Sequence, residues 1–221
     1  MATLVVLGVL SACSSNSSTA GPATTAPPAA ELLAQSATAM AAVTSANFTL
    51  VVEGQLPAVT VNSAAGTLTA AGDAKGTATI TQLGQLLEVE FVLVDQDLYL
   101  KGATGGFAQV PAALAGGIYD PSAILNPDKG VSKVLSSVTG ATNAGTDGDA
   151  WVVTGTVPAA VAGGLVPGLA TDVAGTFTIE MSNSQLTAAQ FQLDGSDGKP
   201  ATVKVELSDL NEAVTISPPG G

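Results

Sequence analysis

The sequence contains no histidine and no arginine, and Cys13 is the single cysteine among its 221 residues. Without histidine, Ser-His-Asp triads, Cys-His pairs and histidine-bearing metal sites are all excluded. Ser132 and Lys133 are adjacent, so on a helix their side chains diverge rather than forming a Ser-Lys dyad. No glycine-rich phosphate motif is present. We therefore expect no enzyme, no cofactor and no metal site.

Charged residues make up only 11% of the chain and are mostly of one sign, with 18 acidic residues against 6 lysines and a net charge of −12. Nucleic acid is a poor partner for such a chain, because counterion release needs a cationic face. Anionic lipid head groups do not attract it either. Aromatic residues make up 4% and hydrophobic residues 46%, so the apolar mass is mainly Ala, Val and Leu.

Long apolar runs are also missing from the body of the chain. After the N-terminus, no segment has the roughly 18 consecutive apolar residues of a membrane span. The longest candidate, Val157 to Ala170, is too short and is interrupted by glycine and proline. Any membrane attachment is therefore expected to come through acyl chains, whose buried methylenes each contribute roughly 0.8 kcal/mol.

The N-terminal residues supply such an attachment point. An apolar run, residues 4–10, leads into Leu10-Ser11-Ala12-Cys13, the order of a bacterial lipoprotein signal. Small side chains admit the signal peptidase, and the Cys13 thiol forms the thioether to diacylglycerol before palmitate-type acylation. The alternative is a short secretory signal with an incidental cysteine. Met1-Ala2-Thr3 lacks the usual basic residue, so we expect a start that lies upstream or has been trimmed.

This motif divides the chain into three parts. Residues 1–12 are the expected signal peptide, and residues 13–30 comprise the lipidated Cys13 and a flexible Ser/Thr/Pro tether. Residues 31–221 form one domain, long enough to bury a sizeable core. We expect the protein to be lipid-anchored on the extracytoplasmic side of the cell membrane, in the cell envelope.

Hydrophobic periodicity predicts an α+β domain with a large antiparallel sheet and a few helices on one face. An alanine-rich segment without Gly or Pro predicts a helix over 31–43. Asp120-Pro121 and Asn126-Pro127 predict two short helices, over 121–125 and 127–138. Alternation with a period of two predicts strands over 47–53, 59–61, 77–81, 87–93, 98–100, 151–157, 176–180, 186–193, 202–207 and 214–216.

Paired carboxylates are the remaining catalytic candidates. Glu88 and Glu90 are two apart on a predicted strand, so they share a face at roughly 6–7 Å, near the spacing of glycosidase acids. The alternative is a solvated outer face. Asp95 with Asp97, and Asp147 with Asp149, are expected in turns, where calcium would need more oxygen ligands.

The opposite, inward face of the predicted strands is apolar. A packed core is its ordinary interpretation, but a sheet with this many strands curls, and fillers that are mainly Ala, Gly and Val leave space. A dry apolar space accommodates alkyl chains. The predicted cavity residues are Phe48, Leu50, Val52, Ala78, Ile80, Leu87, Val89, Phe91, Leu93, Trp151, Val153, Phe177 and Ile179.

Residues 118–135, Ile118-Tyr119-Asp120-Pro121 through Asn126-Pro127 to Leu135, closely resemble the central helical motif of the mycobacterial LppX/LprG-type lipoproteins. Residues 91–99 and 214–219 match the same pattern. The resemblance implies a half-barrel of antiparallel strands with helices on its concave face, enclosing an apolar cavity. It implies binding of multiply acylated lipids or glycolipids and their transport from the inner membrane toward the outer envelope. By position, Ala78 then lies near the cavity mouth beside Ile80, Val89 and Phe91.

The glycine-rich 157–170 segment has two interpretations. One is a mobile lid at the cavity entrance, formed by Val161, Leu165, Val166 and Leu169. The other is a buried helix followed by a loop.

Three hypotheses for the whole protein follow. The leading one is a monomeric lipid carrier that works with a membrane transporter. The second is a surface-interaction or structural lipoprotein with a solid core. The third, the weakest, is a lipid hydrolase that uses Glu88 and Glu90.

Overall fold

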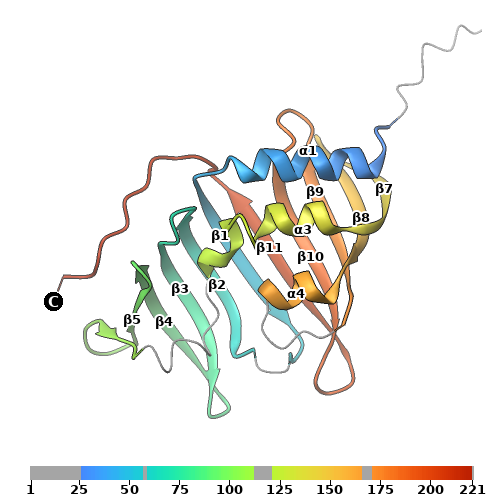
Figure 1. Cartoon of the computed structure of the whole chain (residues 1–221). Helices are drawn as coiled ribbons and strands as arrows, with labels where there is room; N and C mark the ends of the chain where they lie inside the picture. Colours follow the sequence, from blue (N-terminus) through green and yellow to red (C-terminus); the bar gives the residue numbers. More distant parts are fainter. Residues whose placement is uncertain (1–25, 57–58, 112–120, 166–170, 221) are drawn as a thin grey trace, which may run out of the picture.

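The computed structural model describes residues 26–56, 59–111, 121–165 and 171–220 (Figure 1). Within these ranges the strands form one eleven-stranded sheet in the order β6-β5-β4-β3-β2-β1-β11-β10-β9-β8-β7. The strands are β1 Ser45–Glu53, β2 Val61–Thr69, β3 Ala74–Gln82, β4 Gln85–Val94, β5 Asp97–Lys101, β6 Ala108–Gln109, β7 Thr139–Asp147, β8 Ala150–Val157, β9 Val173–Glu180, β10 Leu186–Asp194 and β11 Pro200–Ser208. The helices are α1 Ala29–Ala41, η1 Pro121–Leu125, α3 Val131–Ser137 and α4 Ala159–Leu165.

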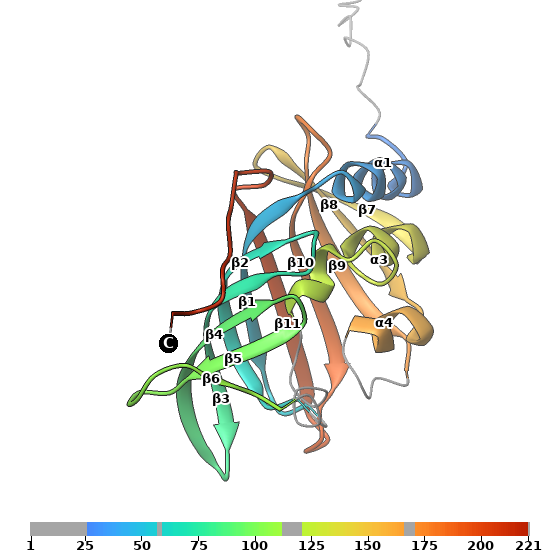
Figure 2. The same cartoon turned by 60° about the vertical axis from the view of Figure 1, so that its left-hand side comes forward.

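All neighbouring strands are antiparallel, and the first strand lies beside the last one in the middle of the sheet. In β1, Leu50 is opposite Val205 of β11 on one side and Ala64 of β2 on the other. Strands β2 to β6 extend from this centre in one direction, and β10 to β7 extend in the other. The sheet curves without closing, with the helices on its concave side (Figure 2). The predicted α+β half-barrel is confirmed.

The helices are held to the sheet and to each other by specific contacts. Met40 of α1 is buried, and its Sδ accepts a hydrogen bond from the Leu186 backbone N–H of β10 at 3.3 Å. Ser132 of α3 donates its hydroxyl to the Ala37 carbonyl of α1 at 2.8 Å. In Figure 1, α1, α3 and α4 lie over the β7–β11 side of the sheet, while η1 packs on β2. The β3–β5 side extends beyond them.

Most predicted elements are present, but the second short helix was predicted to begin too early. It was placed over 127–138, whereas α3 begins at Val131. The Asn126 side chain explains the difference, because its Oδ1 accepts the backbone N–H groups of Asp128, at 2.9 Å, and Lys129, at 3.3 Å. This Asx turn satisfies the donors locally and delays the helix.

The strand predictions differ from the structure at four places: the strand predicted over 59–61 lies at Val61–Thr69, 214–216 is not a strand, and neither β6 nor β7 was predicted. Residues 214–216 form no strand, because both edges of β11 are already paired, with β1 and β10. Conversely, β7 was not predicted. Its sequence, TGATNAGTD, lacks the apolar alternation of a half-buried strand, and β7 lies at an edge of the sheet where most of its residues are exposed.

A pair of glycines allows β2 and β3 to run close together. Gly66 and Gly76 face each other across the ladder. A Cβ on Gly76 would overlap the Ala65 carbonyl oxygen, and a Cβ on Gly66 would overlap the Lys75 carbonyl oxygen. Since both obstacles are backbone atoms in paired strands, neither can move without disturbing the ladder.

Gly76→Ala should therefore lower the free energy of unfolding by about 1–3 kcal/mol, the usual cost of overpacking. Urea denaturation followed by circular dichroism measures it. Gly102→Ala is the matched control, because a Cβ there meets nothing within 4 Å and should change stability by less than about 0.5 kcal/mol. Equal losses in the two variants would contradict this explanation.

Candidate functional site

The candidate site is the concave face of the sheet, and the strand register brings the predicted cavity residues together on it. Ala78 of β3 is opposite Ala64 of β2 and Val89 of β4, and directly opposed residues share a face. In the same way, Phe177 of β9 is opposite Val153 of β8. Trp151, placed by alternation alone, is opposite Ile179 and lies on this face as well.

Burial divides these residues into two groups. One group belongs to the hydrophobic core, and its members are Phe48, Leu50, Phe91, Val153, Phe177 and Ile179. The other group is less covered: Val52, Ala78, Ile80, Leu93 and Trp151 are partly buried, Val89 is half-buried and Leu87 is 38% exposed. The β8–β9 side of the face is thus closed, and the outer part of the β3–β4 side is open.

The middle of β2 and β3 presents almost no side chain to this face. Ala64, Gly66, Gly76 and Ala78 form a two-by-two block of opposed positions, which we call the small-residue floor. Phe48 borders it on β1 and Phe91 on β4. Sequence reasoning identified only Ala78 of the four, although period-two spacing of Ala and Gly was a signal for the others. The floor is an apolar surface between two aromatic side chains, buried at Ala64, where η1 packs on β2, and partly exposed at Ala78.

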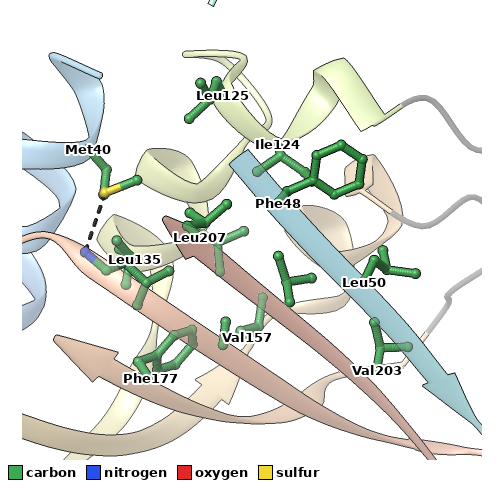
Figure 3. Close-up of a cluster of buried hydrophobic side chains, with 14 of the residues drawn as sticks. Met40, Phe48, Leu50, Ile124, Leu125, Leu135, Val157, Phe177, Val203 and Leu207 are labelled. Carbon is green, nitrogen blue, oxygen red and sulfur yellow. Dashed lines mark hydrogen bonds between the residues drawn. The ribbon is translucent and has the colours of Figure 1, made fainter. Parts of the chain in front are cut away.

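Helical side chains cover the face around Phe48 and across β11 and β10. In Figure 3, Ile124 of η1 lies beside the Phe48 ring, and Leu135 of α3 lies above β10 and β11 near Leu207. Ile124 is 2% exposed and Leu135 is 1% exposed. Leu50 and Val203 project from the same face farther along β1 and β11. The helices therefore close the β1–β11 region near α1.

The segment predicted as a lid contributes the short helix α4. Ala162 of α4 is buried and Val161 is partly buried against the core, and the Asp172 carboxylate accepts the Ala159 backbone N–H at 2.9 Å. The Leu165 side chain, Val166 and Leu169 lie outside the described residues. The lid stays a prediction.

Among the described strand residues, the charged side chains of β4, β5 and β11 lie on the convex face. Glu88 and Glu90 are exposed on the convex side. The Lys101 ammonium forms an ion pair with the Glu90 carboxylate, with 2.7 Å between Nζ and Oε1. Glu206 accepts a hydrogen bond from Lys204 at 2.6 Å, and this bond raises the pKa of Lys204. Nowhere in the described ranges do three metal-ligating side chains cluster. The solvated outer face is the interpretation of Glu88 and Glu90 that this geometry supports.

Comparison with known proteins identifies the family. Residues 28–216 match the family described as LppX_LprAFG lipoprotein. The chain belongs to this family. A lipoarabinomannan carrier protein LprG from Mycolicibacterium hassiacum is 34% identical over 225 residues, which cover 98% of this chain and 94% of the relative. The LprG of Mycobacterium tuberculosis is 32% identical over 221 residues, covering 96% and 89% of the two chains.

Solved structures support the same assignment. LprF from Mycobacterium bovis superposes with a TM-score of 0.76 at 25% identity, covering 87% of this chain and 97% of LprF. LppX from Mycobacterium tuberculosis shares the fold with a TM-score of 0.61 at 22% identity, over 85% and 98% of the two chains. The resemblance inferred from residues 91–99, 118–135 and 214–219 is thereby confirmed.

In the described ranges of this LppX_LprAFG member, no helix is long and apolar enough to cross a bilayer. Cys13, the predicted lipidation site, lies outside the described residues. The first described contact of the N-terminal segment is at its end, where the Pro27 carbonyl accepts the Asn143 side-chain N–H at 3.2 Å.

Proposed function

We propose that this protein is a cell-envelope lipoprotein that binds acylated lipids or glycolipids on its concave face and carries them from the inner membrane toward the outer envelope. Acyl chains on Cys13 would anchor it on the extracytoplasmic side of the membrane. The observation that carries the proposal is the small-residue floor, an apolar surface without large side chains on β2 and β3, beyond the part of the sheet that α1, α3 and α4 cover. The mycobacterial relatives named as lipoarabinomannan carriers support it.

Lipid binding at such a site requires no catalytic residue, because burial of the acyl chains supplies the binding free energy. Each methylene buried from water contributes about 0.8 kcal/mol, so a chain that buries ten methylenes gains roughly 8 kcal/mol before the costs of binding. The lipid head group would remain at the open β3–β4 side, near exposed polar residues. Because the gross attraction is large, release requires opening of the site or transfer to a membrane transporter. Movement of α4, the described part of the lid predicted within 157–170, is one way to open it.

The alternative is a surface-interaction or structural lipoprotein with a solid core. The tight burial of Phe177, Val153 and Ile179 favours it for the β8–β9 side. The two hypotheses differ in one respect: a solid core leaves no space for an alkyl chain over the floor between Phe48 and Phe91.

Native mass spectrometry separates the two functions. The chain from residue 13 on, with Cys13→Ser to prevent acylation, is expressed in a mycobacterial host and purified without detergent. We expect one lipid molecule per monomer, extractable into organic solvent and identifiable by its fragments. Recovery of only lipid-free protein, together with a failure to take up diacylated lipid from vesicles, would support the solid-core alternative.

A further inference from the structure

The hairpin between β3 and β4 has a leucine at its tip. Both the solvent exposure and the positive φ angle of that position are unfavourable for leucine. Leu83 is fully exposed, at 100% of its accessible surface, and has a φ of +51°. Gly84 follows with a φ of +78°, and Gln82 is paired with Gln85. Two positive φ angles define a type I′ turn, in which Asn-Gly is the preferred pair and leucine is strained. Because the Leu83 side chain is fully exposed, no packing contacts offset this backbone strain.

The residues beside Leu83 extend the apolar surface onto both sides of the hairpin. Leu86 is 67% exposed on the convex face, where an exposed strand normally carries polar residues. Leu87 is on the concave face opposite Ile80. No charged residue occurs from 76 to 87, in a chain with a net charge of −12. Glu88 is the first charge beyond the tip, so the uncharged surface ends at a defined depth.

We propose that the β3–β4 tip, residues 82–87, inserts into the surface of a lipid bilayer and brings the open side of the concave face against the membrane. A projecting, uncharged tip with leucines on both faces suits a soft apolar phase, in the way that interfacial segments insert their apolar side chains below the head groups. Ile80 and Leu87 lead from the tip to the small-residue floor, so an alkyl chain would pass from the bilayer along a continuous apolar path. This inference rests on the proposed function.

The tether is long enough for this orientation. The tip lies at the end of the sheet opposite α1 (Figures 1 and 2), and a nine-residue strand such as β3 spans about 30 Å. Residues 14–28 span at most about 50 Å when fully extended. A domain anchored at Cys13 can therefore turn its tip toward the membrane that holds the anchor.

The test places a probe at the tip. The chain from residue 13 on carries Cys13→Ser, an N-terminal hexahistidine tag and Leu83→Cys, labelled with an environment-sensitive dye. It is tethered to phosphatidylcholine vesicles containing a nickel-chelating lipid. The chain has no histidine of its own, so the tether mimics the N-terminal anchor. Ala71→Cys, in the exposed turn at the other end of β3, is the matched control.

We expect vesicles to shift the Leu83→Cys emission to the blue and to protect it from iodide, while the Ala71→Cys probe stays accessible. Equal iodide quenching at both positions would overturn the proposal. So would protection that appears without vesicles or that rises with protein density on them, because both indicate a second copy of the chain as the occupant. Native mass spectrometry of the same samples shows whether lipid is bound, so failure of the tip and failure of the carrier function are distinguishable.

Leu83→Asn provides an independent test without a probe. The variant creates the preferred Asn-Gly turn, so its midpoint of urea unfolding should stay the same or rise. Association of the tip with vesicles should fall about tenfold, the ratio that corresponds to burying one leucine side chain. Lipid transfer between vesicles should slow by a similar factor at unchanged lipid occupancy. Unchanged transfer would show that the exposed leucine has no role at the membrane.

Discussion

Ala78→Trp should abolish lipid loading while leaving the fold intact. Ala78 lies at the centre of the open side, opposite Ala64 and Val89, and its side chain is only partly buried. An indole at this position covers the small-residue floor between β1 and β4. If it displaces only two methylenes of a bound chain, affinity falls about tenfold, and an indole is large enough to displace several more. The fraction of lipid-bound protein in native mass spectra measures the effect.

Ala65→Trp is the matched control for this variant. Ala65 is next to Ala64 on β2 but points to the convex face and is exposed. Ala65→Trp should change the free energy of unfolding by less than about 1 kcal/mol, as surface substitutions usually do. Ala78→Trp should cost about 1–3 kcal/mol, the usual cost of overpacking, and leave the protein folded. Only Ala78→Trp should lose lipid. If it loaded lipid normally, or if Ala65→Trp lost as much lipid, the binding surface would lie elsewhere on the molecule.

The strands were predictable because their chemistry is local. Phe48 and Leu50 alternate with Thr49 in sequence, and the structure buries the first two and exposes the third. The same alternation placed Trp151 on the concave face correctly. Where a strand carries only small or polar residues, as in β7 and in the floor positions Gly66 and Gly76, the periodic signal is too weak to assign the face.

The distribution of the helices over the sheet was not predictable from local patterns. It depends on contacts between segments far apart in sequence, such as Ser132 with Ala37 and Met40 with Leu186. Sequence alone predicted helices on one face but not that they would cover the β7–β11 side and leave the β3–β5 side open. That asymmetry separates the part of the face that stabilises the fold from the part we propose for binding.

Phe177→Ala tests whether the covered β7–β11 side of the face stabilises the fold. The substitution should lower the free energy of unfolding by about 3–5 kcal/mol. Phe177 is 0% exposed, and its ring meets Phe191 edge-to-face with centroids 6.0 Å apart and an interplanar angle of 76°. Truncation leaves a cavity between β8 and β10 and removes the aromatic contact. Since domains of this size are typically stable by about 5–15 kcal/mol, the loss is large. Urea denaturation of the chain from residue 13 on, with Cys13→Ser, measures it.

Leu87→Ala is the counterpart on the open side. Leu87 is on the same concave face but is 38% exposed, so its truncation should cost only about 1 kcal/mol. The effects on lipid should have the opposite order, with Leu87→Ala weakening lipid binding and Phe177→Ala leaving the affinity of the folded fraction unchanged. Similar stability losses for the two variants would mean that the β3–β4 side is packed as tightly as the β8–β9 side. In that case the concave face would be one continuous core, with no surface left for an alkyl chain.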